Sequence, residues 1–135
     1  MKQTLPVLAI ALMISAPGAA QARSSVLTDP PPVKFGCQLP MKTVQNKLKQ
    51  AFIKRGWTAK WVGNGRLVGR IKVRNKHTLV VSVKYNTRQF DIDFKNSDNL
   101  KYRVKDGVQY IHSNANKWMM NVSREAQKLL SAQCL

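Results

Sequence analysis

The sequence predicts an α+β fold: a two-layer sandwich with a four-stranded antiparallel meander and two helices on one face, in the order α-β-β-β-β-α. The sheet is predicted from residues 57–94, where apolar and polar residues alternate with a period of two in four short segments. The helices are predicted from apolar residues at helical spacing in 40–56 and 113–131. Both apolar stripes are expected to cover the apolar face of the sheet.

The lengths of the turns decide which side chains share a face, because a slip of one residue exchanges the two faces of a strand. A two-residue loop at Asn64-Gly65 would place Trp61 on the basic face of the sheet. We favour a three-residue loop at 63–65, which pairs Trp61 with Leu67 and puts Gly65 in the left-handed conformation. The same reasoning predicts an odd-length turn at 74–76 and an even one at 86–89, and a further short hairpin is expected at Asp106-Gly107.

The first helix is expected to begin at Pro40, a favoured first position, and to end before Gly56. The second helix is expected over 113–131, with Ser113 or Asn114 capping its first turn through a side-chain oxygen. Three large aromatic side chains are predicted to be buried between the sheet and the helices: Trp57, Trp61 and Trp118.

The N-terminal residues 1–22 have the pattern of a secretory signal peptide: an early lysine, an apolar run and small residues before Arg23. The alternative is a membrane anchor, but the apolar run is shorter than the about 18 residues that a span requires. Residues 23–36 contain three consecutive prolines and predict an extended linker or a loose tail. Residues 37–135 are then expected to form a single α+β domain in an exported protein, periplasmic or secreted.

The two cysteines, Cys37 and Cys134, stand just before the first helix and just after the second. Export exposes thiols to oxidising conditions, so these two are predicted to form a disulfide. In the chain-entropy model, closing a loop of this size stabilises the fold by about 4 to 5 kcal/mol. Zinc would require more ligands than His77 and His112 provide, so neither a metal site nor a cofactor is predicted.

The chain has 23 Lys and Arg against 6 Asp and Glu, a net charge of +17. Without Lys2 of the signal peptide the balance is 22 against 6, or +16. Such a charge indicates anionic partners and carries no information about the fold. The sheet face opposite the helices is expected to carry a group of cations that we predict to bind anions: Lys60, Arg66, Arg70, Lys72 and Lys84.

The alternative for these cations is an ordinary solvated surface. The two adjacent strands that carry most of them contain no acid, and this self-repulsive arrangement favours an anion-binding role over mere solvation. Aromatic stacking platforms are missing from this face, so nucleic acid is not expected as a partner. Asp91 and Asp93 should face outward near Lys84, where cross-strand charge pairing is a better explanation than acid-base catalysis. No nucleophile with a base is apparent, so the protein is not expected to be an enzyme.

Several short motifs resemble a family of small exported bacterial envelope proteins, often lipoproteins, whose function is unassigned. The motifs are Gly56-Trp57, Ser97-x-Asn99-Leu100-x-Tyr102, Ile111-His112 and Asn116-Lys117-Trp118. The resemblance implies envelope localisation and one compact α+β domain, although this chain lacks the lipid-attachment cysteine of the lipoprotein members. It also directs attention to a polar cluster that is either a site or a structural knot around the helix start: Asn99, Tyr102, His112 and Asn116.

Together these observations predict a non-enzymatic, exported basic binding module for an anionic envelope component or an acidic protein. The alternative is a small secreted inhibitor or effector of another protein, in which the charge would serve the encounter between the partners.

Overall fold

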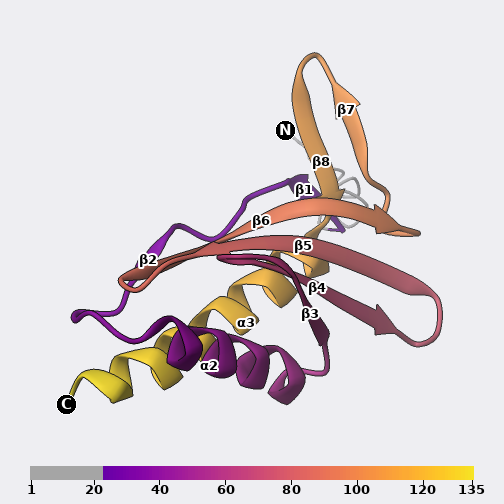
Figure 1. Cartoon of the computed structure of the whole chain (residues 1–135). Helices are drawn as coiled ribbons and strands as arrows, with labels where there is room; N and C mark the ends of the chain where they lie inside the picture. Colours follow the sequence, from indigo (N-terminus) through magenta and orange to yellow (C-terminus); the bar gives the residue numbers. More distant parts are fainter. Residues whose placement is uncertain (1–22) are drawn as a thin grey trace, which may run out of the picture.

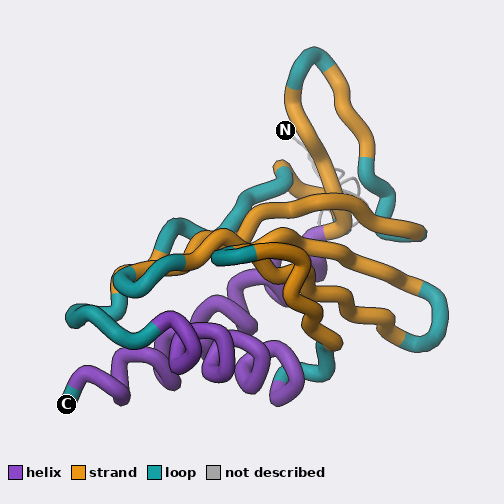
Figure 2. The backbone as a smooth tube through the Cα atoms, viewed as in Figure 1, coloured by secondary structure: helices purple, strands orange, loops and turns teal. Residues whose placement is uncertain are grey.

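The computed structural model describes residues 23–135, and the predicted signal peptide at 1–22 lies outside the described residues. Over these residues the protein is α+β, with two α-helices and two antiparallel sheets (Figures 1 and 2). In chain order the elements are β1 (Ser24–Val26), β2 (Val33–Lys34), α2 (Met41–Lys54), β3 (Thr58–Gly63), β4 (Arg66–Val73), β5 (His77–Tyr85), β6 (Gln89–Asp98), β7 (Arg103–Lys105), β8 (Val108–His112), α3 (Ser113–Ser131) and η2 (Ala132–Cys134).

The predicted meander is present as β3 to β6, but the sheet has five strands in the order β2-β6-β5-β4-β3. A second sheet has three strands in the order β1-β8-β7; its β7–β8 hairpin is the one expected at Asp106-Gly107, whereas the pairing of β8 with β1 was not predicted. Figure 1 shows α2 and α3 on the same side of the larger sheet, and the hairpin of β7 and β8 projecting away from both layers. The prediction missed β1 and β2 because these strands are only three and two residues long, too short to show an alternating pattern.

The strand register places the side chains on the predicted faces of the sheet, although the first turn is shorter than predicted. Trp61 pairs with Leu67 as predicted, but Gly63 pairs with Arg66, so the loop has two residues and the extra residue is a bulge at Val62. Gly65 is left-handed, with φ of 73°. The pairs that close the next two turns confirm their odd and even lengths: Val73 with His77, and Tyr85 with Phe90.

The core lies between the larger sheet and the two helices, and its fully buried side chains include Leu48, Phe52, Leu79, Val81, Val83, Ile92, Met119 and Leu130. Phe52 packs directly on the backbone of β4, where a Cβ at Gly69 would lie 2.3 Å from its ring. Trp57 is buried and meets Phe52 edge to face, with ring centroids 5.3 Å apart.

The prediction that all three tryptophans are buried was wrong in part. Trp118 is only partly buried, and Trp61 is 42% exposed. Trp61 shares the face of Leu67 but lies on β3, the edge strand of the sheet. Lys49 of α2 lies over its ring, 4.9 Å from the centroid, and shields one side.

Both helices occupy the predicted ranges. The first begins after Pro40 and gives way to Gly56, whose φ of 85° is left-handed. The cap of the second helix differs from the prediction, because it comes from His112 and not from Ser113 or Asn114: the imidazole Nδ1 accepts a hydrogen bond from the backbone N–H of Asn114 at 3.1 Å.

The segment 23–36 is extended, as its prolines predict, but it is packed onto the domain and is not held apart from it. Its two short strands pair with β8 and with the edge of β6. Between them the carboxylate of Asp29 accepts a hydrogen bond from the backbone N–H of Phe94 at 2.8 Å. The predicted disulfide between Cys37 and Cys134 is confirmed, with their Cα atoms 5.6 Å apart. Among residues 23–135, no helix is long and apolar enough to cross a membrane.

Candidate anion-binding face

The predicted cations occupy one surface of the larger sheet, the one opposite the helices. Along β4 they alternate with Leu67 and Gly69, which are buried toward the helices. Arg66 pairs with Lys84 on β5, and Lys60 pairs with Val68. We call this surface the basic face and define it by five residues: Lys60, Arg66, Arg70, Lys72 and Lys84.

The five side chains of the basic face are exposed. Within the described part of the chain, the ion pairs shorter than 4.0 Å all involve Glu125, so none of these cations is neutralised at short range. The sequence contains no Asp or Glu between Asp29 and Asp91, which leaves β3, β4 and β5 without any acid. The positive charges therefore remain available to an anion from outside.

In the part of the chain that the structure describes, the carboxylates near this surface lie on its β6 side. Asp91 pairs with Lys84 and Asp93 with Ser82, as predicted, but no ion pair within 4.0 Å joins these groups in the described residues. The packed N-terminal segment adds Asp29 to the same side. Burial raises the pKa of Asp91, the neighbouring Asp93 and Asp29 raise it further, and Lys84 opposes them. The surface is thus divided into a cationic part on β3 to β5 and a narrow acidic margin on β6.

Burial also raises the pKa of Asp29, although the hydrogen bond from the N–H of Phe94 works in the opposite direction. The Asp29 carboxylate bonds to the edge of β6 at Phe94, beyond the two residues of β6 that pair with β2. This role is structural, because the hydrogen bond satisfies a backbone donor that would otherwise be exposed at the edge of the sheet.

A hollow of about 340 Å³ indents this surface where β3, β4, β5 and β6 lie side by side. It is lined by two cations of the basic face, Arg66 and Lys84, and by Lys95, which the sequence analysis did not select. Lys95 lies at a bulge in β6, between Phe94, which pairs with Val81, and Asn96, which pairs with Val80. The sequence gives only a weak indication of this bulge: the alternation of apolar and polar residues along the strand stops after Phe94.

The predicted polar cluster does not meet at one point. Asn116 joins α3 to the N-terminal segment: its amide nitrogen donates to the carbonyl oxygen of Val26 at 2.9 Å, and its amide oxygen accepts from the N–H of Thr28 at 3.0 Å. Tyr102 belongs to the base of the projecting hairpin, where its hydroxyl accepts from Gln109 at 2.9 Å. Both side chains therefore have structural partners.

His112 lines a hollow of about 260 Å³ together with His77, the other histidine of the chain, and Asn99 contacts His77. His77 Nδ1 lies 2.8 Å from the carbonyl oxygen of Asn99, and the side-chain amide of Asn99 donates to the carbonyl oxygen of Lys76 at 3.4 Å. These contacts join the turn between β4 and β5 to the connection that follows β6. They favour the structural knot over a binding site.

The imidazole of His112 lies among positive charges. Burial lowers its pKa most, and the nearby Lys101, His77, Arg23 and Lys117 lower it further. The neutral ring is therefore favoured, and its unprotonated Nδ1 can accept the hydrogen bond that caps α3.

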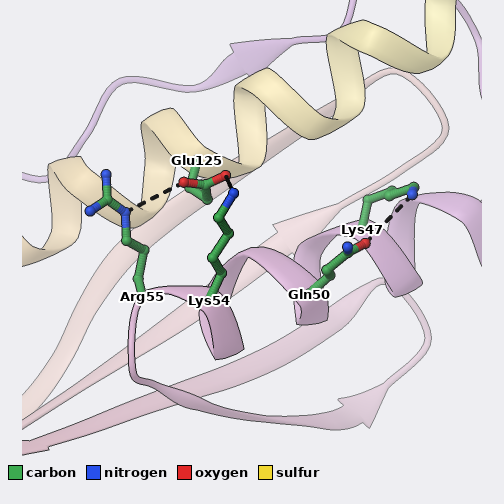
Figure 3. Close-up of polar contacts among 5 residues, drawn as sticks. All are labelled: Lys47, Gln50, Lys54, Arg55 and Glu125. Carbon is green, nitrogen blue, oxygen red and sulfur yellow. Dashed lines mark hydrogen bonds and ion pairs between the residues drawn. The ribbon is translucent and has the colours of Figure 1, made fainter.

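Glu125 is the residue that the sequence analysis missed altogether. It is the single glutamate of the chain, it is buried in α3, and it faces the end of α2 (Figure 3). Its carboxylate lies 3.3 Å from the Lys54 ammonium and 3.6 Å from the Arg55 guanidinium. Figure 3 also shows Lys47 donating to Gln50, one turn earlier on α2. Glu125 joins the two helices and is remote from the basic face, which lies on the other side of the sheet.

Residues 23–135 contain no group of three or more His, Cys, Asp or Glu side chains arranged to hold a metal ion. Comparisons with protein-family models, curated proteins and solved structures found no match for this chain. The resemblance to small exported envelope proteins therefore stays a prediction from the short motifs.

Proposed function

We propose that this protein is a non-enzymatic binding module, exported to the periplasm or secreted, that holds an anionic component of the cell envelope on its basic face. The observation that carries the proposal is the set of five exposed cations on one sheet surface without an ion-pair partner in the described residues. The disulfide and the signal-peptide pattern at 1–22 support export.

The spacing of the cations suits a ligand that carries charge at regular intervals. Neighbouring strands are about 4.8 Å apart, and alternate residues of a strand are about 7 Å apart. Arg66, Arg70 and Lys72 lie along β4, with Lys60 and Lys84 on the two adjacent strands. The resulting grid offers several simultaneous contacts to a flexible polyanion, whereas a small ion would use only one or two of the cations.

The experiment measures binding of a linear polyphosphate of defined length between 50 and 200 mM salt. Each neutralised charge contributes about 0.7 to 0.9 to the slope of log K against log salt, so five contacts predict a loss of about 100- to 500-fold over this range. Replacing Arg70→Gln and Lys72→Gln together should reduce the loss to about 20- to 40-fold. The fold should survive, because exposed substitutions of this kind change stability by no more than about 0.5 kcal/mol each.

The matched control removes the same charge from the helix layer, with Lys42→Gln and Lys128→Gln. Both side chains are exposed on α2 and α3. Lys49 is unsuitable, because its removal would also break the cation-π contact with Trp61. The control should keep the wild-type slope. Equal changes in both double variants would mean that only net charge matters, and the basic face would then not be the binding site.

A second candidate function, a secreted inhibitor or effector of another protein, is supported by the hairpin that projects from the domain in Figure 1. Val104 and Val108 of this hairpin are apolar side chains that are 57% and 37% exposed, so both are accessible to a protein partner. A packed protein interface persists in moderate salt, whereas polyanion binding does not. A partner that is captured equally at low and high salt, and is lost on Val104→Ser, would favour this candidate.

A further inference from the structure

The hollow on the basic face is bounded by the two bulges of the larger sheet. In β3 the extra residue is Val62, between the pairs of Trp61 and Gly63, and in β6 it is Lys95, between the pairs of Phe94 and Asn96. Both extra residues line the same hollow. Bulges bend a strand and re-aim a side chain, and they are frequent beside functional sites. Two irregularities on opposite sides of the regular pair β4 and β5 thus produce one depression.

The polar groups around this depression match a phosphate group. Arg66 and Lys84 lie directly opposite each other on β4 and β5, and Lys95 adds a third cation from β6. Ser82, two residues before Lys84 on the same face of β5, adds a hydroxyl that can donate or accept. A phosphomonoester has three terminal oxygens and close to two negative charges, and the planar guanidinium of arginine can bind two of these oxygens at once.

The rest of the lining is apolar, with Val62 and Val68 among the residues that form it. A volume of about 340 Å³ is at the small end of ligand sites and holds one ring-sized unit, not a stretch of polymer. Free phosphate would leave these valines exposed to water, whereas a sugar ring that carries the phosphate would cover them. The depression therefore differs in kind from the flat cationic grid around Arg70 and Lys72.

We propose that the hollow between the two bulges is a subsite for a single phosphomonoester group carried on a sugar-sized unit. The inference rests on the proposed function, since it assigns the chemistry of one terminal unit of the anionic component that the basic face holds. The same chemistry occurs in a free sugar phosphate and in a phosphorylated glycolipid, so the two sources have to be distinguished by experiment.

The test titrates the protein with glucose 1-phosphate, glucose and inorganic phosphate, and follows backbone amide shifts by NMR. Glucose 1-phosphate should shift the amides around Ser82 and Lys95 and should bind at least about tenfold more tightly than the other two probes. Lys95→Gln should weaken its binding about tenfold, the effect of one lost charge-assisted hydrogen bond. The Arg70→Gln, Lys72→Gln double variant should stay within twofold of the wild type.

The polyphosphate measurement separates the two proposals. Lys95 lies beside two cations of the basic face, so Lys95→Gln should remove at most one polyphosphate contact and lower the salt slope by no more than about 0.7 to 0.9, while the Arg70→Gln, Lys72→Gln variant lowers it by about twice as much. Inorganic phosphate binding as tightly as glucose 1-phosphate, or unchanged binding of glucose 1-phosphate by Lys95→Gln, would overturn the subsite and leave the proposed function intact. A normal subsite with no polyphosphate binding would overturn the proposed function alone.

Binding to lipid vesicles tests whether the phosphorylated sugar unit is carried by a lipid. Vesicles that contain a phosphorylated glycolipid are compared with vesicles of phosphatidylcholine alone and with vesicles of an anionic phosphodiester lipid at equal surface charge. Binding to the first type only, weakened by Lys95→Gln, supports a lipid-borne unit. Equal binding to both anionic types would show that the membrane is recognised by charge only, and the lipid-borne unit would have to be abandoned.

Discussion

The disulfide between Cys37 and Cys134 offers the most quantitative test of how this domain is stabilised. It joins residues 97 positions apart, so it closes a loop that contains both helices and most of the strands. Replacing both cysteines by alanine frees this loop in the unfolded chain. The chain-entropy relation for a loop of this length gives a loss of about 4.7 kcal/mol at 25 °C. A loss of this size is a large part of the about 5 to 15 kcal/mol that stabilises a typical domain.

Urea denaturation followed by circular dichroism measures the effect. The double variant should unfold at a much lower urea concentration, with the free energy of unfolding reduced by about 3 to 5 kcal/mol and with an unchanged spectrum in the absence of urea. The reduced wild-type protein is the matched control and should behave like the variant. A reduction below about 1 kcal/mol would refute the reasoning, because it would mean that the unfolded chain is not constrained by the link. Two free thiols in the exported protein would refute the pairing itself.

Two further predictions concern polar side chains of α3 and of its cap. Glu125→Gln should lower the free energy of unfolding by about 1 to 3 kcal/mol, because the carboxylate is buried beside two cations. Lys54→Gln should lower it by no more than about 1 kcal/mol, since the Lys54 side chain is 58% exposed. Urea denaturation compares the two variants, and equal losses would contradict the role of Glu125 as the buried partner. The second concerns His112, whose pKa in the folded protein lies below its ordinary value of 6.5. The unfolded chain therefore binds the proton first, so this contribution to stability is complete above about pH 6.5 and declines as the pH falls through the lower folded-state pKa. His112→Asn keeps an oxygen that can cap α3 and should flatten the decline measured by melting between pH 7.5 and 5.5, and an undiminished decline would show that another group is responsible.

Part of the candidate site could be predicted from the sequence because strand alternation is a local property. Once Trp61 is paired with Leu67, the positions of Arg66, Arg70 and Lys72 on the opposite face follow from the period of two. The observed bulge at Val62 preserves this facing even though the loop has two residues. The hollow was not predictable in the same way, since it depends on a second bulge in β6 that breaks the alternation at Lys95.

The polar cluster shows the limit of motif reasoning. Asn99 and Asn116 stand in short motifs, but their side chains bond to backbone groups of distant segments, the carbonyl oxygens of Lys76 and Val26. The local sequence pattern does not predict such partners. Glu125 illustrates the same point, because a single acid in a helical stripe has no visible partner until α2 and α3 are packed together.

By itself the sequence determined the α+β class, the ranges of both helices, the facing of the four-strand meander and the pairing of the two cysteines. These features depend on residue periodicity, on Pro and Gly at helix ends, and on the small number of thiols. Only the tertiary structure decided that the segment 23–36 adds strands to both sheets, that Trp61 is left exposed at the end of the larger one, and that Lys95 joins Arg66 and Lys84 around one hollow. Each of these depends on contacts between segments far apart in the chain, and short-range sequence patterns do not encode them.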